Sequence, residues 1–216
     1  YSQECSRKQK LQEKLHRVFH QYGFEDIETP TFEYFEVFSK EVGTIPSRDL
    51  YKFFDREGNT LVLRPDFTPS VSRACATYFN PEKEVVSLCY TGNTFINNSS
   101  FRGRLKETTQ MGVERMGDDS PEADAEILAM TVECLLATGL TEFQVSVGQV
   151  DYYKAIFAQT GLSQEEEEEL RELISQKNYF GVEELVKNKN MDKSLARVLS
   201  QLPQMFGSTE VLEKAK

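Results

Sequence analysis

The sequence of 216 residues has no tryptophan, only two histidines and only four cysteines. The cysteines form no CxxC pair and show no spacing suited to zinc, so we expect reduced thiols in a cytoplasmic protein. No apolar run approaches the roughly 18 residues that a membrane-spanning helix needs, and the first twenty residues are too charged for a signal peptide. The absence of Met before Tyr1 suggests a piece of a longer chain.

Positive charge is also scarce, because 25 Lys and Arg face 35 Asp and Glu and leave a net charge of −10. Such an acidic surface repels phosphate, so we expect no nucleic-acid or membrane partner. The motifs GxGxxG and GxxxxGK[ST] are absent, and we predict no cofactor. A hydrophobic content of 39% with 15 Phe and 9 Tyr is enough for a globular core.

Periodicity predicts both helices and strands. We expect helices over residues 2–22, 35–43, 69–78, 123–138 and 150–159. We expect strands over residues 24–27, 50–54, 60–64, 85–91, 107–116 and 143–147. Because hairpins and long loops join most of the strands, the pattern favours an α+β fold with an antiparallel sheet flanked by helices.

The end of the chain reads differently. From Gly161 onward only helices are predicted, with Ser163 as a cap and the acidic run 165–169 in the first turns of a helix. We therefore expect a core over residues 1–160 and a helical segment of uncertain role over residues 161–216.

One predicted strand carries a polar face. Gln110, Gly112 and Glu114 share one side of the strand over residues 107–116. This face could hold an amine-bearing ligand, with Glu114 as the charge partner and Gly112 leaving room for it. An ordinary solvated sheet face is the alternative.

A second candidate lies where a predicted strand meets a helix. Asp66 and Thr68 follow Arg64 there and could orient a small ligand, although the same residues also suit a helix cap and a salt bridge. The loop over residues 101–106 places Arg102, Arg104 and Lys106 near a glycine, which suits a phosphate, an acidic partner or simply solvated surface.

The two histidines give little indication of a metal. His16 and His20 are four residues apart on one predicted helix face. The Glu of the zincin motif is missing, and no third ligand is evident, so we predict no metal site and no catalytic residue.

Five motifs resemble, in order, the catalytic core of the histidyl-tRNA synthetase family. They are YGFEDIETP at 22–30, LRPDFT at 63–68, YTGNTF at 90–95, GRLKETTQMGVE at 103–114 and DAE at 124–126. The resemblance covers residues 11–150 and implies the class II aminoacyl-tRNA synthetase fold. It also implies that Asp66, Thr68, Gln110 and Glu114 occupy the positions that hold histidine, with Asp66 a shorter substitute for a Glu.

The ATP position departs from the active members of the family. These carry Arg-x-Glu directly after Phe95, whereas this chain has Ile96-Asn97-Asn98. An apolar Ile96 cannot stabilise charge on a phosphate, and the loss of one preorganised donor typically costs on the order of 10²–10³ in rate. The resemblance therefore implies a degenerate ATP site at Ile96 and Asn98 and no adenylation activity.

The family also contains a regulatory subunit of ATP phosphoribosyltransferase, which acts in histidine biosynthesis, and the segment over residues 89–98 is more similar to that branch. We therefore expect a non-catalytic subunit that activates a catalytic partner and takes part in histidine sensing. The resemblance implies a hetero-oligomer, and a homodimer through the first helix to Pro30. A synthetase core that activates histidine with ATP and a pure assembly scaffold are the alternatives.

Overall fold

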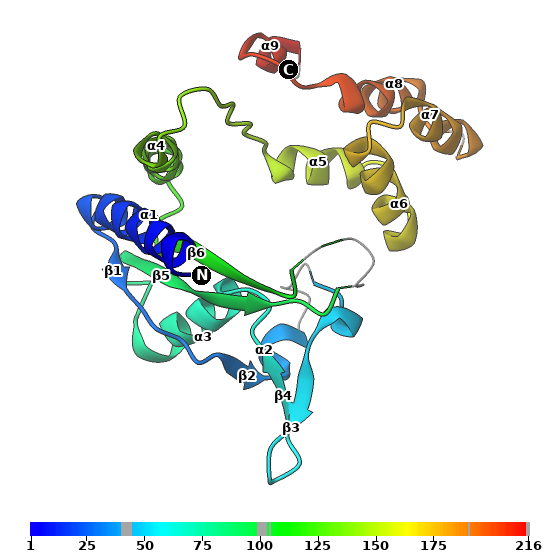
Figure 1. Ribbon diagram of the computed structural model, residues 1–216. Coiled ribbons are helices and arrows are strands. Elements are labelled where there is room, and N and C mark those ends of the chain that lie inside the picture. Colours follow the sequence, from blue (N-terminus) through cyan, green and yellow to red (C-terminus); the bar gives the residue numbers. More distant parts are fainter. Residues whose placement is uncertain (40–44, 99–102, 104, 190, 215–216) are drawn as a thin grey trace. The chain divides into compact units, whose positions relative to one another are not determined.

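The computed structural model describes residues 1–39, 45–98, 103, 105–189 and 191–214 (Figure 1). Within these residues the chain divides into two compact units, Tyr1–Val145 and Ser146–Lys216. Each unit has its own apolar core, and each is described separately below.

The first unit is built on a sheet of three strands, β1 (Glu25–Asp26), β5 (Val86–Phe95) and β6 (Glu107–Met116), in the order β1-β5-β6. The long hairpin of β5 and β6 is antiparallel and stays in register from Val86↔Met116 to Phe95↔Glu107. The predicted long-looped hairpin is therefore present. β1 instead pairs parallel to β5, a feature that the sequence pattern did not indicate.

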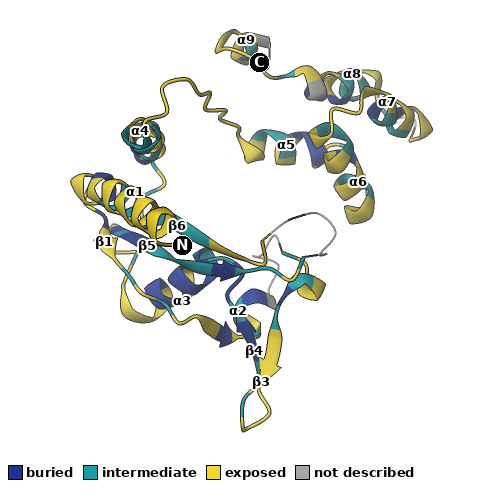
Figure 2. Cartoon of the chain, viewed as in Figure 1, coloured by how far each residue is buried: buried dark blue, intermediate teal, exposed yellow. Residues whose placement is uncertain are grey.

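Helices cover both faces of this sheet (Figure 2). On one face α1 (Ser2–Gln21) and α4 (Pro121–Thr138) pack against Cys89 and Val113. On the other face α3 (Thr68–Tyr78) buries Val71 against Leu88. The alternation of side chains along β5 divides its residues between these two cores.

A smaller antiparallel sheet has the order β2-β4-β3, with β2 at Phe32–Tyr34, β4 at Thr60–Leu63 and β3 at Lys52–Phe54. α2 (Glu36–Ser39) contributes Phe38 to its core beside Val62, and a 3₁₀ turn, η1 (Ser47–Asp49), precedes β3. The predicted hairpin of β3 and β4 is confirmed. The predicted helix over 35–43 is confirmed only for Glu36–Ser39, since residues 40–44 lie outside the described part.

The second unit consists of helices. They are α5 (Val150–Phe157), α6 (Gln164–Ser175), α7 (Tyr179–Asn188), α8 (Lys193–Gln201), the 3₁₀ turn η3 (Leu202–Gln204) and α9 (Glu210–Lys214). Ser163 caps α6 as predicted and forms a capping box with Glu166. Leu170, Val182 and Leu199 are completely buried in the apolar core of this unit.

Two sequence expectations need correction. The division between the units falls after Val145 rather than after residue 160, because Ile156 and Phe157 of α5 pack into the helical core. Residues 143–147 alternate like a strand but form none. A strand needs a neighbouring strand for its backbone hydrogen bonds, and the described chain supplies none there. In the described residues no helix is both long and apolar enough to span a membrane.

Candidate functional site

The structure brings together the four residues that were predicted to hold a ligand. Asp66 lies just before α3, Thr68 is the first residue of α3, and Gln110 and Glu114 lie on β6. The hydroxyl of Thr68 donates a hydrogen bond of 2.6 Å to Glu114 Oε1. Gln110 Nε2 donates one of 3.2 Å to Asp66 Oδ1. The strand and the helix start therefore build one polar cluster between them.

Tyr90 is a further member of the cluster, which the sequence analysis did not single out. It lies on β5 directly opposite Gly112 and is only 4% exposed. Its ring stacks on Phe67 at 4.3 Å between centroids, and its hydroxyl accepts a hydrogen bond of 3.4 Å from Gln110 Nε2. Its place in the motif over residues 90–95 was the available signal, but the cross-strand register was needed to use it.

Gly112 makes room for a side chain of this protein. A Cβ at Gly112 would lie 2.4 Å from the Tyr90 hydroxyl oxygen and 2.6 Å from Cζ. The expectation that Gly112 leaves open space for a ligand is therefore wrong in this structure, because the Tyr90 ring crosses from the neighbouring strand into that space.

The cluster is electrostatically unusual because two carboxyl groups face the same half-buried space. Burial raises the pKa of Glu114, and the charge of Asp66 raises it further, against hydrogen bonds from Thr68 and Tyr90 that lower it. Burial and the same two carboxylates raise the pKa of the Tyr90 hydroxyl. A cationic donor would relieve this excess of negative charge, so the arrangement suits an ammonium or a protonated ring.

Arg64, at the strand end before Asp66, is buried and serves the backbone. Its Nε donates to the carbonyl of Asn93 and its Nη1 to the carbonyl of Thr29, both at 2.8 Å. Its guanidinium also lies over the Phe67 ring, 4.0 Å from the centroid. Arg64 therefore stabilises the backbone beside the cluster, because it holds the chain before β2 against β5.

The two residues of the degenerate ATP position lie just beyond β5. The Ile96 amide donates to the carbonyl of Lys106 at 2.9 Å, which continues the hairpin by one pair. Asn98 Nδ2 reaches the carbonyl of Leu105 at 3.5 Å, while its Oδ1 is buried with no partner among the described atoms. Neither residue offers a positive charge. Of the predicted cationic loop, Arg102 and Arg104 lie outside the described residues.

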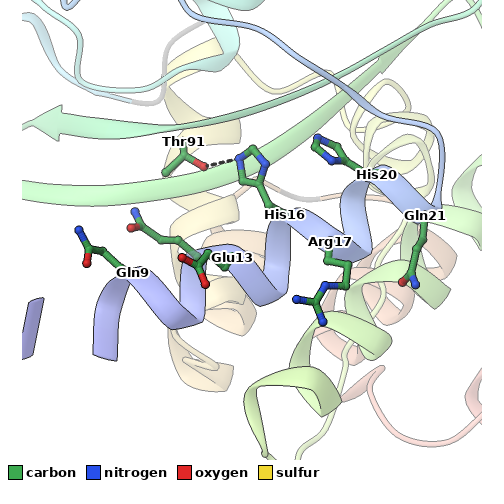
Figure 3. Close-up of a pocket in the computed structure, with 8 residues that line it drawn as sticks. Gln9, Glu13, His16, Arg17, His20, Gln21 and Thr91 are labelled. Carbon is green, nitrogen blue, oxygen red and sulfur yellow. Dashed lines mark hydrogen bonds between the residues drawn. The ribbon is translucent and has the colours of Figure 1, made fainter. Parts of the chain in front are cut away.

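His16 and His20 line an open groove along α1 together with Gln9, Glu13 and Arg17 (Figure 3). Both imidazoles lie within hydrogen-bonding or ion-pair distance of Asp26 on β1. The structure therefore places a third potential ligand beside the two histidines, where the sequence showed none.

The helix-flanked sheet, its long hairpin and the polar cluster at the start of α3 define a class II aminoacyl-tRNA synthetase-like core, as the sequence predicted. The chain belongs to the histidyl-tRNA synthetase family, whose family model, described as histidyl-tRNA synthetase, matches residues 1–216.

Comparison with individual relatives favours one branch of this family. The chain is 41% identical over 213 residues to the ATP phosphoribosyltransferase regulatory subunit of Acetivibrio thermocellus, covering 99% of this chain and 51% of the relative. The subunit of the same name from Ruminiclostridium cellulolyticum is 38% identical over the same shares of both chains. The chain spans about half the length of these relatives.

A solved structure agrees with this grouping. The ATP phosphoribosyltransferase regulatory subunit/histidyl-tRNA synthetase from Bacillus halodurans C has a TM-score of 0.84 and 32% identity. The similarity covers 97% of this chain and 54% of that one. The similarity to regulatory subunits that the sequence indicated is therefore confirmed.

Proposed function

We propose that this chain is part of a non-catalytic regulatory subunit of ATP phosphoribosyltransferase, a glycosyltransferase of histidine biosynthesis. The whole subunit activates the catalytic subunit in a cytoplasmic hetero-oligomer and takes part in sensing histidine. It forms a homodimer through residues 2–30. The names of its relatives support this proposal. Because the chain spans about half the length of these relatives, the proposal concerns the longer protein.

One observation carries the proposal. The polar cluster of Asp66, Thr68, Gln110 and Glu114 is assembled, while the neighbouring ATP position holds the uncharged Ile96 and Asn98. A synthetase needs both halves, because the α-phosphate of ATP must be neutralised during adenylation. A sensor needs only the amino-acid half.

The chemistry of the cluster fits histidine. The carboxyl groups of Asp66 and Glu114 can accept hydrogen bonds from an α-ammonium or from an imidazole N–H. A hydrogen bond to a charged group contributes about 1.5–3 kcal/mol when it is shielded from water. In this structure the same groups bond to one another, so histidine has to replace the contacts between Thr68 and Glu114 and between Gln110 and Asp66.

The test uses the complete complex with the catalytic subunit. We expect Glu114→Gln and Gln110→Ala to weaken inhibition by histidine several-fold without affecting subunit assembly. Glu107→Gln is the matched control, because Glu107 lies on the same strand but its side chain faces the other side of the sheet. The control should keep normal inhibition.

Three outcomes would contradict parts of the proposal. Unchanged inhibition in both variants would place the histidine sensor elsewhere. An absence of heat on titration of the full subunit with free histidine would favour a scaffold. Histidine-dependent exchange of pyrophosphate into ATP by the unmodified subunit would favour a synthetase core.

A further inference from the structure

A cluster of four residues of types that bind metals lies on the opposite face of the sheet from the candidate histidine site. His16 and His20 come from α1, Asp26 from β1 and Cys89 from β5. One ligand atom of each lies within 4.8 Å of the others. The sequence did not reveal this set because the parallel pairing of β1 with β5 is what brings Asp26 next to Cys89.

We propose that His16, His20, Asp26 and Cys89 bind a divalent transition-metal ion, with zinc the best match. Two imidazole nitrogens, one carboxylate oxygen and one thiolate sulfur are a typical donor set for zinc. Histidines four residues apart on a helix present both rings on one side. One carboxylate and one thiolate neutralise a charge of +2, so the occupied site carries no net charge.

The distances fit a site that is close to its final geometry. Asp26 Oδ1 lies 3.3 Å from His16 Nδ1, and its Oδ2 lies 2.9 Å from His20 Nε2. The Cys89 thiol donates to Asp26 Oδ1 at 3.4 Å. Neighbouring ligand atoms of a tetrahedral zinc ion are separated by about 3.4 Å, as follows from the usual zinc–ligand distances of 2.0–2.3 Å. The two contacts of Asp26 Oδ1, with His16 and with Cys89, already have this spacing, and His20 contacts the other oxygen of the same carboxylate.

Thr91 orients the first of the histidines. Its hydroxyl oxygen lies 3.1 Å from His16 Nε2 (Figure 3). With the hydrogen of the ring on Nε2 and donated to Thr91, the lone pair of Nδ1 faces Asp26. Metal-bound histidines usually make such a bond with their second nitrogen, because it fixes the tautomer and the ring orientation.

One side of the site is shielded from solvent and the other side is exposed. Cys89 is completely buried, whereas the side chains of His20 and Asp26 are 49% and 56% exposed. In the single chain, the site is therefore open to solvent on the side of His20 and Asp26. The bound metal replaces the proton of the Cys89 thiol, and this proton is released to solvent.

The test uses the untagged full-length protein, because a histidine tag would itself bind metal. After dialysis against zinc chloride and removal of free zinc, mass spectrometry of the metal content should find about one zinc per chain. With cobalt(II) in its place, the protein should show a thiolate-to-cobalt charge-transfer band in the near ultraviolet. His20→Gln should weaken zinc binding by about 100-fold or more. Even the loss of a residue that only hydrogen-bonds to a metal ligand typically lowers the metal affinity by about 10–100-fold.

Controls separate this site from adventitious binding. Cys89→Ser should abolish the charge-transfer band, whereas Cys134→Ser should keep it, because Cys134 packs in the same core but is not part of the cluster. The half-exposed His20→Gln carries the test where Cys89→Ser does not fold, with circular dichroism as the check of its fold. No stoichiometric zinc, or zinc affinity unchanged in His20→Gln, would overturn the proposal in favour of an ordinary ion-pair network around Asp26.

Discussion

Glu114 is held by two opposing influences. Thr68 and Tyr90 hydrogen-bond its carboxylate and favour the charged form, while burial and the nearby Asp66 favour the neutral form. The second pair dominates, so the pKa of Glu114 is raised in the folded protein. Keeping Glu114 charged in this position costs free energy, and a cationic ligand would remove that cost. Such an arrangement is expected of a binding site rather than of a residue selected only for stability.

This raised pKa predicts how stability depends on pH. A carboxyl group with a raised pKa binds its proton more tightly in the folded state, so its contribution to stability is largest at low pH and is lost as the pH rises through the folded pKa. Glu114→Gln removes this titration. The variant should therefore gain stability relative to the unmodified protein as the pH rises from about 4 toward 8, the range above the ordinary pKa of Glu.

Urea unfolding at a series of pH values, followed by tyrosine fluorescence, measures this difference. Glu142→Gln is the control, since it removes one exposed carboxylate outside the cluster and reports the general effect of reducing a charge of −10. A stability difference between Glu114→Gln and the unmodified protein that stays constant with pH would contradict the assignment.

Some residues of the site were accessible from the sequence and others were not. The alternation along residues 107–116 placed Gln110 and Glu114 on one face, and the family resemblance added Asp66 and Thr68. Tyr90 was missed because its role depends on the register that sets it opposite Gly112. Asp26 and Cys89 were missed because only the pairing of β1 with β5 brings these two residues together.

At the scale of elements, the β5 and β6 hairpin supports both candidate sites. Its two faces present the residues of different candidate sites, because side chains alternate across a sheet. One face presents Tyr90, Gln110 and Glu114 beside α3, and the other presents Cys89 and Thr91 beside α1. A slip of one residue in the register would exchange the two sets and destroy both sites.

The packing of this hairpin predicts the effect of Gly112→Ala. The new Cβ would lie within 2.6 Å of two Tyr90 atoms, and the Tyr90 ring cannot withdraw because it is buried against Phe67. We expect a loss of about 1–3 kcal/mol in the free energy of unfolding, as is usual for overpacking. Thermal and urea unfolding measure it.

Gly148→Ala is the matched control, because a Cβ at Gly148 meets no atom within 4 Å. This variant should unfold like the unmodified protein. If Gly112→Ala is equally stable, the Tyr90 ring does not occupy the space above β6 in solution.

Element prediction succeeded where local and long-range signals agreed. β6 has the predicted bounds, whereas β5 runs to Phe95 instead of ending at Thr91. Gly92 and Asn93 are poor strand formers, but the ladder with β6 holds them in the sheet. The reverse happened at residues 143–147, where a good alternating pattern has no strand to pair with in the described chain.

At the scale of the whole molecule, each of the two units buries apolar residues of its own. Leu170 and Leu199 lie at the centre of the helical unit, and the core residues of Tyr1–Val145 form other clusters. Because each unit buries its own apolar surface, we expect each to gain or lose stability without the other.

Leu170→Ala tests this independence. Removal of a fully buried leucine side chain should cost about 2–5 kcal/mol in the helical unit. Hydrogen exchange followed by mass spectrometry should therefore be faster in α6, α7 and α8 but unchanged in β5 and β6. Leu212→Ala, at a position 59% exposed, is the control and should change neither unit.

Faster exchange in both units of Leu170→Ala would contradict the prediction. It would mean that the chain unfolds as one cooperative body.

The sequence by itself determined the class of fold, most element positions and the family, because periodicity, turn residues and ordered motifs are local properties of the chain. The family resemblance also predicted the four residues of the candidate histidine site and the altered ATP position at Ile96 and Asn98. Only the tertiary structure decided that α5 belongs to the helical unit, that Tyr90 fills the space above Gly112, and that Asp26 and Cys89 meet the two histidines. Each of these depends on strand pairing or core packing between distant segments, and the free energy of such contacts is not encoded in any single stretch of sequence.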